Sequence, residues 1–333
     1  MELAFSSDQR DLFDAFEQFF RRESTPAVVR GAEPLGDDAV LWRKLDGMEL
    51  WGSGATVSDL AVIAETAGRW LAPVPFVEHA VASPLLAGHA DWSAASPATI
   101  SLRAADADAC WSLVPAGAIA KVVVGLDGDD LVAVRADPPG KGPRNHASAP
   151  IADRSARDGE RVVLGGAAEM ERALAEWKVL TAATLVGISA RALELAVQYV
   201  QERQQFGVPI GSFQAVQHGL ADLPGSIDGA RLLLHKAAAA LDRNAAGLCD
   251  TARNDIDDPV ALASMAFLFA SEVAAHATDR SLHFHGGYGF AEEYDIQLYY
   301  RRARGWSLIL GEPAAELLDL ADRFWPPTQD GAA

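Results

Sequence analysis

The 333-residue sequence is poor in cysteine and in positive charge. Its two cysteines, Cys110 and Cys249, are too few for a disulfide framework and do not form a metal-binding motif, which is typical of a reducing cytoplasm. Its 28 Lys and Arg face 46 Asp and Glu, giving a net charge of −18. This charge argues against nucleic acid and anionic membranes as partners.

Long apolar runs and a secretion signal are also lacking. The longest apolar runs, such as PVALASMAFLFA, are shorter than the roughly 20 residues of a membrane span. The first residues, MELAFSSDQRDLFDAF, lack the basic and apolar regions of a signal peptide. Half of the chain is hydrophobic, which is enough to build a sizeable core. The sequence therefore predicts a soluble cytoplasmic protein.

Three segments that differ in composition and hydrophobic periodicity predict three domains. Residues 1–92 read as helical, with a capping box at Ser6 to Gln9 and a candidate N-cap at Ser58. Residues 93–167 are β-rich: KVVVGL and DLVAVRAD flank Asp-Gly-Asp, a hairpin signal, and RVVLGG follows as a last strand. This β segment is too short for a doubly wound sheet.

Residues 168–328 return to helical periodicity. Apolar-periodic stretches at 170–202, 212–242, 257–284 and 305–323 are separated by short connections. Four such helices predict an antiparallel four-helix bundle. The expected fold is therefore mainly α, with a small central β domain between two helical domains.

The stretch ERQQFGVPIGSFQ at 202–214 ends the first of these helices. A cation such as Arg203 is stabilised at a helix C-terminus, which could explain this residue alone. It does not explain Phe206, Phe213 and Gln214 at close range. An arginine fork, aromatic faces and an amide together suit a phosphate-linked aromatic ligand such as a nucleotide.

The pattern E-R-x-x-F-G-x-x-I-x-x-F-Q-x-x-Q resembles the C-terminal domain of the acyl-CoA dehydrogenase family. DQRDLFDAFEQFF and LWRKLDGMELWG are similar to the N-terminal helical domain of that family, and HFHGGYGFAEEYDIQLYYRRAR to its later glycine-rich segment. The resemblance implies an N-terminal helical domain, a β domain and a C-terminal four-helix bundle. It also implies a homotetramer or heterotetramer that binds FAD and oxidises acyl-CoA thioesters between Cα and Cβ.

The resemblance also implies cofactor contacts to the FAD of a neighbouring subunit. Arg203 would contact the pyrophosphate, Phe206 would pack on the adenosine end, and Gln214 would hydrogen-bond to it. A glycine-rich turn would complete the site, because backbone there must approach the dinucleotide without a Cβ. The residues implied for this turn are His283, Gly286 and Gly287.

The catalytic base is where the sequence departs from the family. Most members carry a glutamate before the glycine of an E-G-T/S segment, and here Leu310 takes that position. A minority carry the base near the start of the helix leading to E-R-x-x-F-G, where this chain has Trp177. Glu312 and Glu176 lie next to these positions and are weak alternatives.

The middle segment departs as well. Residues 95–125 contain nothing like the T-E-P-x-x-G-S-D stretch of members that hold their own flavin ring. The chain thus resembles the short subunit of heterotetrameric actinobacterial acyl-CoA dehydrogenases of steroid and sterol side-chain degradation, in which one subunit type lacks the base. The implied partner is a full-length homologue with the catalytic glutamate and a shared FAD. A steroid-CoA is compatible as substrate, and electron-transfer flavoprotein or oxygen as acceptor.

Two other functions remain open at this point. The chain could be a self-sufficient homo-oligomeric dehydrogenase that uses Glu312 or Glu176, or a structural or acyl-CoA-binding homologue without turnover. The histidines at 276, 283 and 285 do not have metal-ligand spacing, so no metal is expected. The RRAR run at 301–304 is expected on a solvated or interfacial face, and the acidic loop NDIDDP in water.

Overall fold

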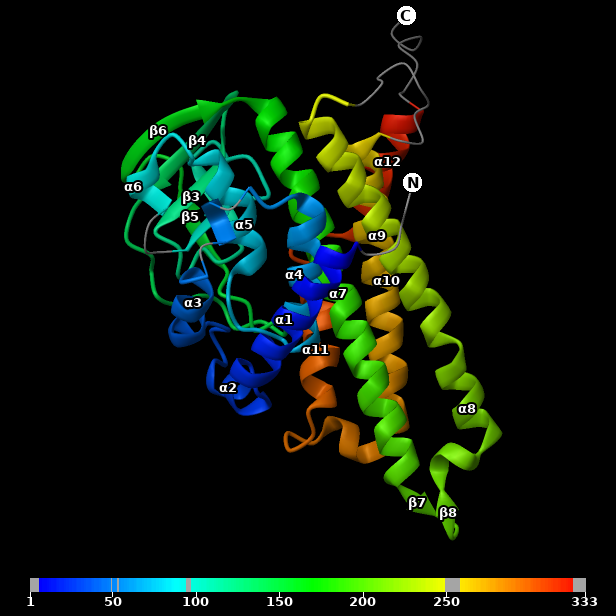
Figure 1. Cartoon of the computed structure of the whole chain (residues 1–333). Helices are drawn as coiled ribbons and strands as arrows, with labels where there is room; N and C mark the ends of the chain where they lie inside the picture. The colour runs from blue at the N-terminus through cyan, green and yellow to red at the C-terminus, as the bar shows by residue number, and fades with distance from the viewer. Residues whose placement is uncertain (1–5, 49, 53, 94–96, 249–257, 326–333) are drawn as a thin grey trace, which may run out of the picture.

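The computed structural model describes residues 6–48, 50–52, 54–93, 97–248 and 258–325 (Figure 1). An N-terminal group of helices leads into a small β region, which is followed by long helices. This is the expected fold class, mainly α with a small central β region. The N-terminal helices are α1 (Ser7–Glu23), α2 (Pro26–Gly31), α3 (Ala39–Asp46), α4 (Val57–Arg69), α5 (Phe76–Leu85) and α6 (Ala90–Ser93).

Side-chain caps fix where the N-terminal helices begin. The predicted capping box of α1 is confirmed, since the Ser6 hydroxyl accepts from the Gln9 N–H and the Gln9 side chain accepts from the Ser6 N–H. The prediction that Ser58 caps the next helix is wrong, because Thr56 is the N-cap of α4. Ser58 instead donates from its hydroxyl to Asp242, which joins α4 to the bundle.

The β region consists of two small sheets. One has the order β1-β3-β4-β6, with β1 parallel to β3 and the other pairs antiparallel; the second pairs β2 with β5. The predicted hairpin is confirmed: Asp127 pairs with Asp130 across a turn in which Gly128 has a φ of +63°. The strands are β1 (Ala98–Ile100), β2 (Cys110–Val114), β3 (Val122–Asp127), β4 (Asp130–Arg135), β5 (Ala152–Ser155) and β6 (Glu160–Gly165).

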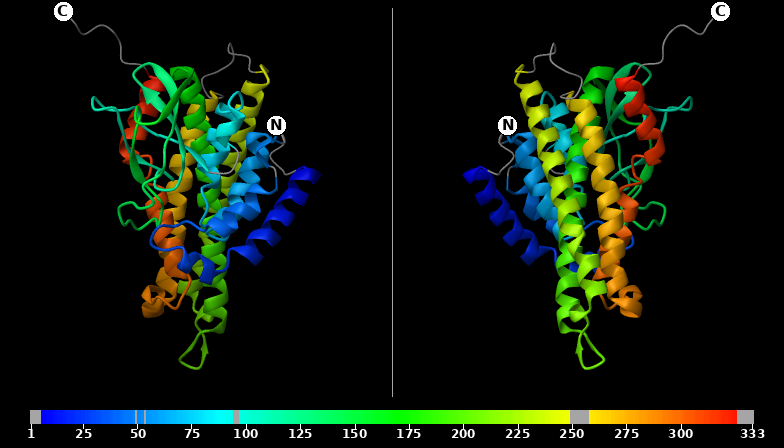
Figure 2. Two further views of the ribbon diagram at one scale, coloured as in Figure 1. Left: turned by 90° about the vertical axis from the view of Figure 1, so that its left-hand side faces the viewer. Right: turned by 90° about the vertical axis from the view of Figure 1, so that its right-hand side faces the viewer.

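The long C-terminal helices form the bundle (Figure 2). α7 packs against α9, α10 and α11, and α10 also contacts α9 and α12. The helices are α7 (Ala167–Glu202), α8 (Gln214–Ala221), α9 (Leu223–Ala245), α10 (Pro259–Phe284), α11 (Ile296–Trp306) and α12 (Pro313–Phe324). Most of the acidic loop NDIDDP, and also Cys249, lie outside the described residues.

Two predicted helix boundaries are wrong. The stretch 212–242 is divided at Asp222 into α8 and α9. The stretch 305–323 is not one helix, because α11 ends at Trp306 and α12 begins at Pro313. Gly311, with a φ of +133°, lies in the connection, and such a backbone cannot continue a helix.

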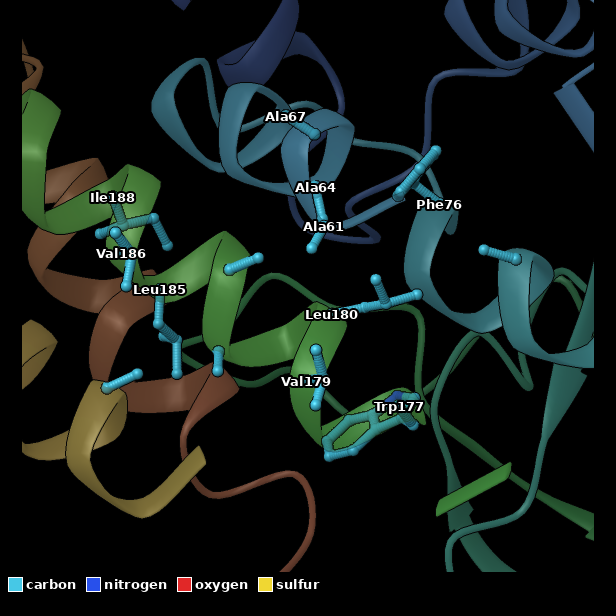
Figure 3. Close-up of a cluster of buried hydrophobic side chains, with 14 of the residues drawn as sticks. Ala61, Ala64, Ala67, Phe76, Trp177, Val179, Leu180, Leu185, Val186 and Ile188 are labelled. Carbon is cyan, nitrogen blue, oxygen red and sulfur yellow. The ribbon is translucent and has the colours of Figure 1, made fainter. Parts of the chain in front are cut away.

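The core centres on the contact between α4, α5 and α7 (Figure 3). Ala64 and Leu180 from facing helices are buried there, with Phe76 of α5 beside them. The backbones of α4 and α7 approach so closely that a Cβ on Gly187 would lie 2.0 Å from the carbonyl oxygen of Glu65. Glycine at this position therefore sets the distance between the two helices.

Two of the described helices, α7 and α10, are long and apolar enough to cross a membrane by length and composition. The sequence prediction counted only uninterrupted apolar runs and missed them. In these helices 72% and 61% of the most apolar window is buried inside the protein. Burial against neighbouring helices accounts for their apolar composition.

Candidate functional site

The segment after α7 forms a projecting arm, which we define as residues 203–213. It contains the short hairpin of β7 (Gln204–Gln205) and β8 (Val208–Pro209), followed by a single 3-10 turn. The hairpin lies at one extremity of the molecule in all three ribbon views (Figures 1 and 2). Phe206 and Gly207 both have positive φ, +55° and +84°, as a two-residue hairpin of this kind requires.

The aromatic residues of the arm are presented to solvent. Phe206 is 93% exposed, and its ring lies 6.2 Å from that of the partly exposed Phe213 in an edge-on arrangement. Gln214, the first residue of α8, is exposed next to them. A large apolar side chain held outside the fold in a left-handed conformation costs stability, and a contact with another molecule would offset that cost.

Arg203 lies at the base of the arm, as the C-cap of α7. Its N–H donates to the Tyr199 carbonyl at 2.8 Å, and its guanidinium lies 5.2 Å from the centre of the Tyr288 ring. Among the described residues, no carboxylate pairs with this half-buried guanidinium. It therefore retains the donors of its fork for a ligand.

The glycine-rich turn lies against the base of the arm through Tyr288. Gly286 has a φ of +60°, and a Cβ on either Gly286 or Gly287 would meet nothing within 4 Å, so the backbone here faces open space. His283 is exposed at the end of α10. The buried ring of His285 stacks on Tyr199 at 4.3 Å.

The histidines of this region have no metal site around them. Within the part of the chain that the structure describes, no three His, Cys, Asp or Glu side chains are grouped to hold a metal ion. The Nδ1 atom of His285 lies 2.8 Å from the Ser281 carbonyl, and burial lowers the pKa of this ring. His285 is thus a neutral packing residue.

An interior cavity of about 80 Å³ lies between Trp177 and the segment next to Leu310. Trp177 lines one side and is fully buried; Figure 3 shows its side chain beside Val179. Ile309, next to Leu310, lines the other side. The Leu310 carbonyl accepts from the Arg103 guanidinium at 2.8 Å, so this segment is fastened to the β region. Neither position offers a proton acceptor on its side chain.

The two alternative carboxylates lie away from the cavity. Glu176 pairs with Arg172 on the next turn of α7 at 2.9 Å, and burial raises its pKa. Glu312 is exposed at the N-terminus of α12. Lys178, which follows Trp177, bonds with Glu316 at 2.5 Å and with the Ser264 hydroxyl at 3.0 Å.

The structure brings a different carboxylate to the cavity, that of Glu78 on α5. Burial raises the pKa of this carboxyl, with the indole of Trp177 opposing the shift. Sequence reasoning missed Glu78, although a lone acid in the apolar stretch FVEHAVAS is a usable signal. It also missed Arg103, whose neighbours in the sequence carry no recognisable motif.

The prediction for the RRAR run is wrong at Arg302. This side chain is 1% exposed and lines the same cavity, whereas Arg304 is exposed. Burial lowers the pKa of Arg302 to about 10, and the charge of Glu33, 3.0 Å away, opposes that shift. Arg301 pairs with the same carboxylate at 2.7 Å. One end of the cavity is therefore positively charged.

Comparison with known proteins agrees with this architecture. Residues 165–324 match the family described as acyl-CoA dehydrogenase, C-terminal domain. The acyl-CoA dehydrogenase IpdE2 of Mycolicibacterium smegmatis is 29% identical over 93% of this chain and 97% of its own length. The protein of the same name from Mycobacterium tuberculosis is 31% identical over 91% of this chain and 93% of its own length.

Solved structures share the fold over nearly the whole chain. One chain of the steroid ACAD Tcur3481-Tcur3483 superposes with a TM-score of 0.80 at 26% identity, covering 96% of this chain and 98% of that one. A chain of the ChsE4-ChsE5 complex from Mycobacterium tuberculosis gives a TM-score of 0.82 over 98% and 99%, but at 22% identity this likeness concerns the fold alone. The length, order of elements and full-length relatives agree, and this chain belongs to the acyl-CoA dehydrogenase family.

Proposed function

We propose that this chain is one subunit of an FAD-dependent acyl-CoA dehydrogenase complex. In this complex it supplies contacts to the FAD held by a homologous subunit that carries the catalytic glutamate. The similar structure at 26% identity is the steroid ACAD Tcur3481-Tcur3483, whose double name supports a two-subunit assembly. We extend the proposal to α,β-desaturation of an acyl-CoA such as a steroid-CoA, in the cytoplasm.

The observation that carries the proposal is the free fork of Arg203 at the base of an exposed arm. Within one chain, the arm projects from the end of the bundle that lies away from the β region (Figure 1). Arg203, Phe206 and Gln214 are thus available to a second molecule. A diphosphate needs charged donors, an adenine needs an aromatic face, and both are present here.

The residues of this region suit a bound FAD in charge and in space. Arg203 has no carboxylate to neutralise it among the described residues, and its donors would hold the pyrophosphate oxygens. The open backbone at Gly286 and Gly287 would admit the dinucleotide. FAD, when bound, supplies the hydride acceptor for the oxidation. The role of this chain is to retain and orient the adenosine end.

The cavity side of the chain supports a division of labour between the subunits. Removal of an α-proton needs a carboxylate within reach of the substrate. Leu310 and Trp177 cannot accept a proton, and the segment around Leu310 is fixed by Arg103. A cavity of about 80 Å³ is also far below the several hundred Å³ of a typical ligand pocket. The base and substrate pocket would therefore come from the partner.

The test is the absorbance at about 450 nm of oxidised flavin. It is measured on this chain purified alone and after coexpression with candidate homologous subunits from the same genome. We expect a colourless chain alone, and a yellow complex with one flavin for each pair of subunits. Addition of the correct acyl-CoA should then bleach the complex.

Two outcomes would contradict the proposal. A yellow chain with one FAD per copy, bleached by an acyl-CoA, would establish a self-sufficient dehydrogenase. A complex that copurifies with its partner but whose flavin content is unaffected by this chain would assign it a structural role. The two outcomes differ in flavin stoichiometry and in the effect of removing this chain.

A further inference from the structure

The interior cavity next to Trp177 has no role in the function proposed above for the arm. It lies between α4, α5, α7, α11 and the loop at 148–150, and it is partly open to solvent. Its walls are mostly apolar and include Ala67, Phe76 and Ile309. The proposed role of the arm leaves this cavity unused, so the inference below goes beyond the proposed function and depends only on residues of this chain.

Arg302 is the feature that distinguishes the cavity from a packing defect. The side chain is 1% exposed, its Nη2 has no hydrogen-bond acceptor among the described residues, and its Nη1 has only the ion pair with Glu33. Its Nη1 lies 3.0 Å from Glu33, but that carboxylate is shared with Arg301 at 2.7 Å. A buried guanidinium with unsatisfied donors is costly, and an acceptor placed against the fork would relieve that cost.

The size of the cavity limits what the acceptor can be. At roughly 15 Å³ for each water-sized group, it accommodates about five non-hydrogen atoms. A carboxylate matches the guanidinium fork with two parallel hydrogen bonds, and a short alkyl group matches the apolar walls. We propose that this cavity binds a small monocarboxylate, such as acetate or propionate, with its carboxylate on Arg302.

The other charged groups near the cavity are compatible with an anion. Glu78 lines the wall with Trp177, and Glu33 lies outside it against Arg301 and Arg302. Arg301 and Arg302 carry two positive charges against the single negative charge of Glu33, so the Arg302 end of the cavity has a net positive charge. The buried indole N–H of Trp177 lies on the same wall and interacts with the Glu78 carboxyl.

The test is titration calorimetry of propionate into the full chain, in complex with its partner subunit where the two copurify. We expect saturable binding of one propionate per chain, in about the millimolar range for so small a ligand. Propionamide has the same shape without the charge, and it should not saturate at tenfold higher concentration. Equal binding of propionate and propionamide, or no saturable binding of propionate, would overturn the proposal.

Two variants test the Arg302 guanidinium and the free space of the cavity independently. Arg302→Lys keeps the charge beside Glu33 but loses the planar fork, and it should weaken propionate binding at least tenfold. Ala149→Leu leaves Arg302 intact and adds bulk at the half-buried loop lining; it should abolish binding. Thermal unfolding checks that each variant is folded. If Arg302→Lys does not fold, undiminished binding in Ala149→Leu alone refutes the site.

Discussion

Asp37 lies between Gly36, whose φ is +82°, and Asp38, the N-cap of α3. Burial raises the pKa of the Asp37 carboxyl to about 6, and the negative charge of Asp38 adds to the shift. Asp38 is itself committed, since its carboxylate accepts from the Val40 and Leu41 N–H groups. The ionised form of the Asp37 carboxyl is therefore unfavourable in the folded protein.

We expect Asp37→Asn to stabilise the protein at neutral pH. The folded-state pKa is above the unfolded value of 3.8, so the wild-type protein loses stability as the pH rises through 6. The amide removes this loss, and the gain at pH 7 should be about 1–2 kcal/mol after allowing for screening of a half-buried group. Urea unfolding should show the gain shrinking as the pH falls from 6 toward 4.

Asp137→Asn is a suitable control, because this residue is exposed after β4. Its effect should stay within about 0.5 kcal/mol at every pH. A gain for Asp37→Asn that persists undiminished at pH 4 would show that the carboxyl is not the cause.

Residues of the site differed in how far the sequence could predict them. Arg203 and Phe206 belong to a short segment whose composition alone suggests a ligand, and the structure leaves both accessible. Arg302 was predicted on a solvated or interfacial face because charge runs usually lie there. Instead, Glu33 pairs with Arg301, 268 residues further along the chain, and with Arg302, which holds this run against the fold. Such a long-range pair leaves no local pattern.

At the scale of elements, Gly187 determines how closely α4 and α7 pack. An alanine Cβ there would lie 2.0 Å from the Glu65 carbonyl oxygen and 2.9 Å from the Arg69 nitrogen, both rigid backbone atoms. Gly187→Ala must therefore push the helices apart, and we expect a loss of at least about 2–3 kcal/mol in the free energy of unfolding.

Gly225→Ala is the matched control in another long helix. Nothing lies within 4 Å of the added Cβ at this exposed position of α9. Alanine is a better helix former than glycine, so this variant should gain up to about 1 kcal/mol. Chemical denaturation of both variants measures the contrast, and a neutral Gly187→Ala would mean that the two helices can separate freely.

The ion pair between Lys178 and Glu316 attaches α12 to α7. Both side chains are nearly buried, at 12% and 10% exposure, and their atoms lie 2.5 Å apart. Glu316→Gln leaves the lysine charge without its partner, which should cost about 3–5 kcal/mol in unfolding free energy. Arg157→Gln breaks a pair with Asp127 at the surface and should cost far less, because solvent screens that pair. Comparable losses in both variants would argue against this account.

Helices were easier to predict than their ends. The capping box of α1 and the β3–β4 hairpin follow from contacts within a few residues, and both are confirmed. The break between α11 and α12 was missed because apolar periodicity continues across it, while the left-handed Gly311 and Pro313 stop the helix. In a sequence, a single glycine or proline does not by itself exclude a continuous helix. The backbone conformation at that residue shows whether the helix ends there.

At the scale of the whole molecule, the arm and the region around the cavity differ in the partners that their charged side chains have. The arm carries an exposed aromatic pair and a free arginine, whereas the cavity end contains tightly bonded residues such as Lys178 and Arg103. Within a single chain, the arm has no described partner of opposite charge. Under the proposed function its ligand belongs to a second subunit, and the effect of Arg203 is then measurable only in the assembled complex.

Arg203→Ala should weaken FAD retention in the complex with the partner subunit. Loss of a charge-assisted phosphate contact costs about 2–3 kcal/mol, or roughly a hundredfold in affinity. Flavin released on dilution, followed by fluorescence, gives the dissociation constant. Arg43→Ala is the control, because that exposed arginine donates to the Ala39 carbonyl of its own helix and lies outside the arm. If both variants retain flavin as the wild type does, while the complex stays assembled, then Arg203 is a helix-terminal charge and the arm serves assembly alone.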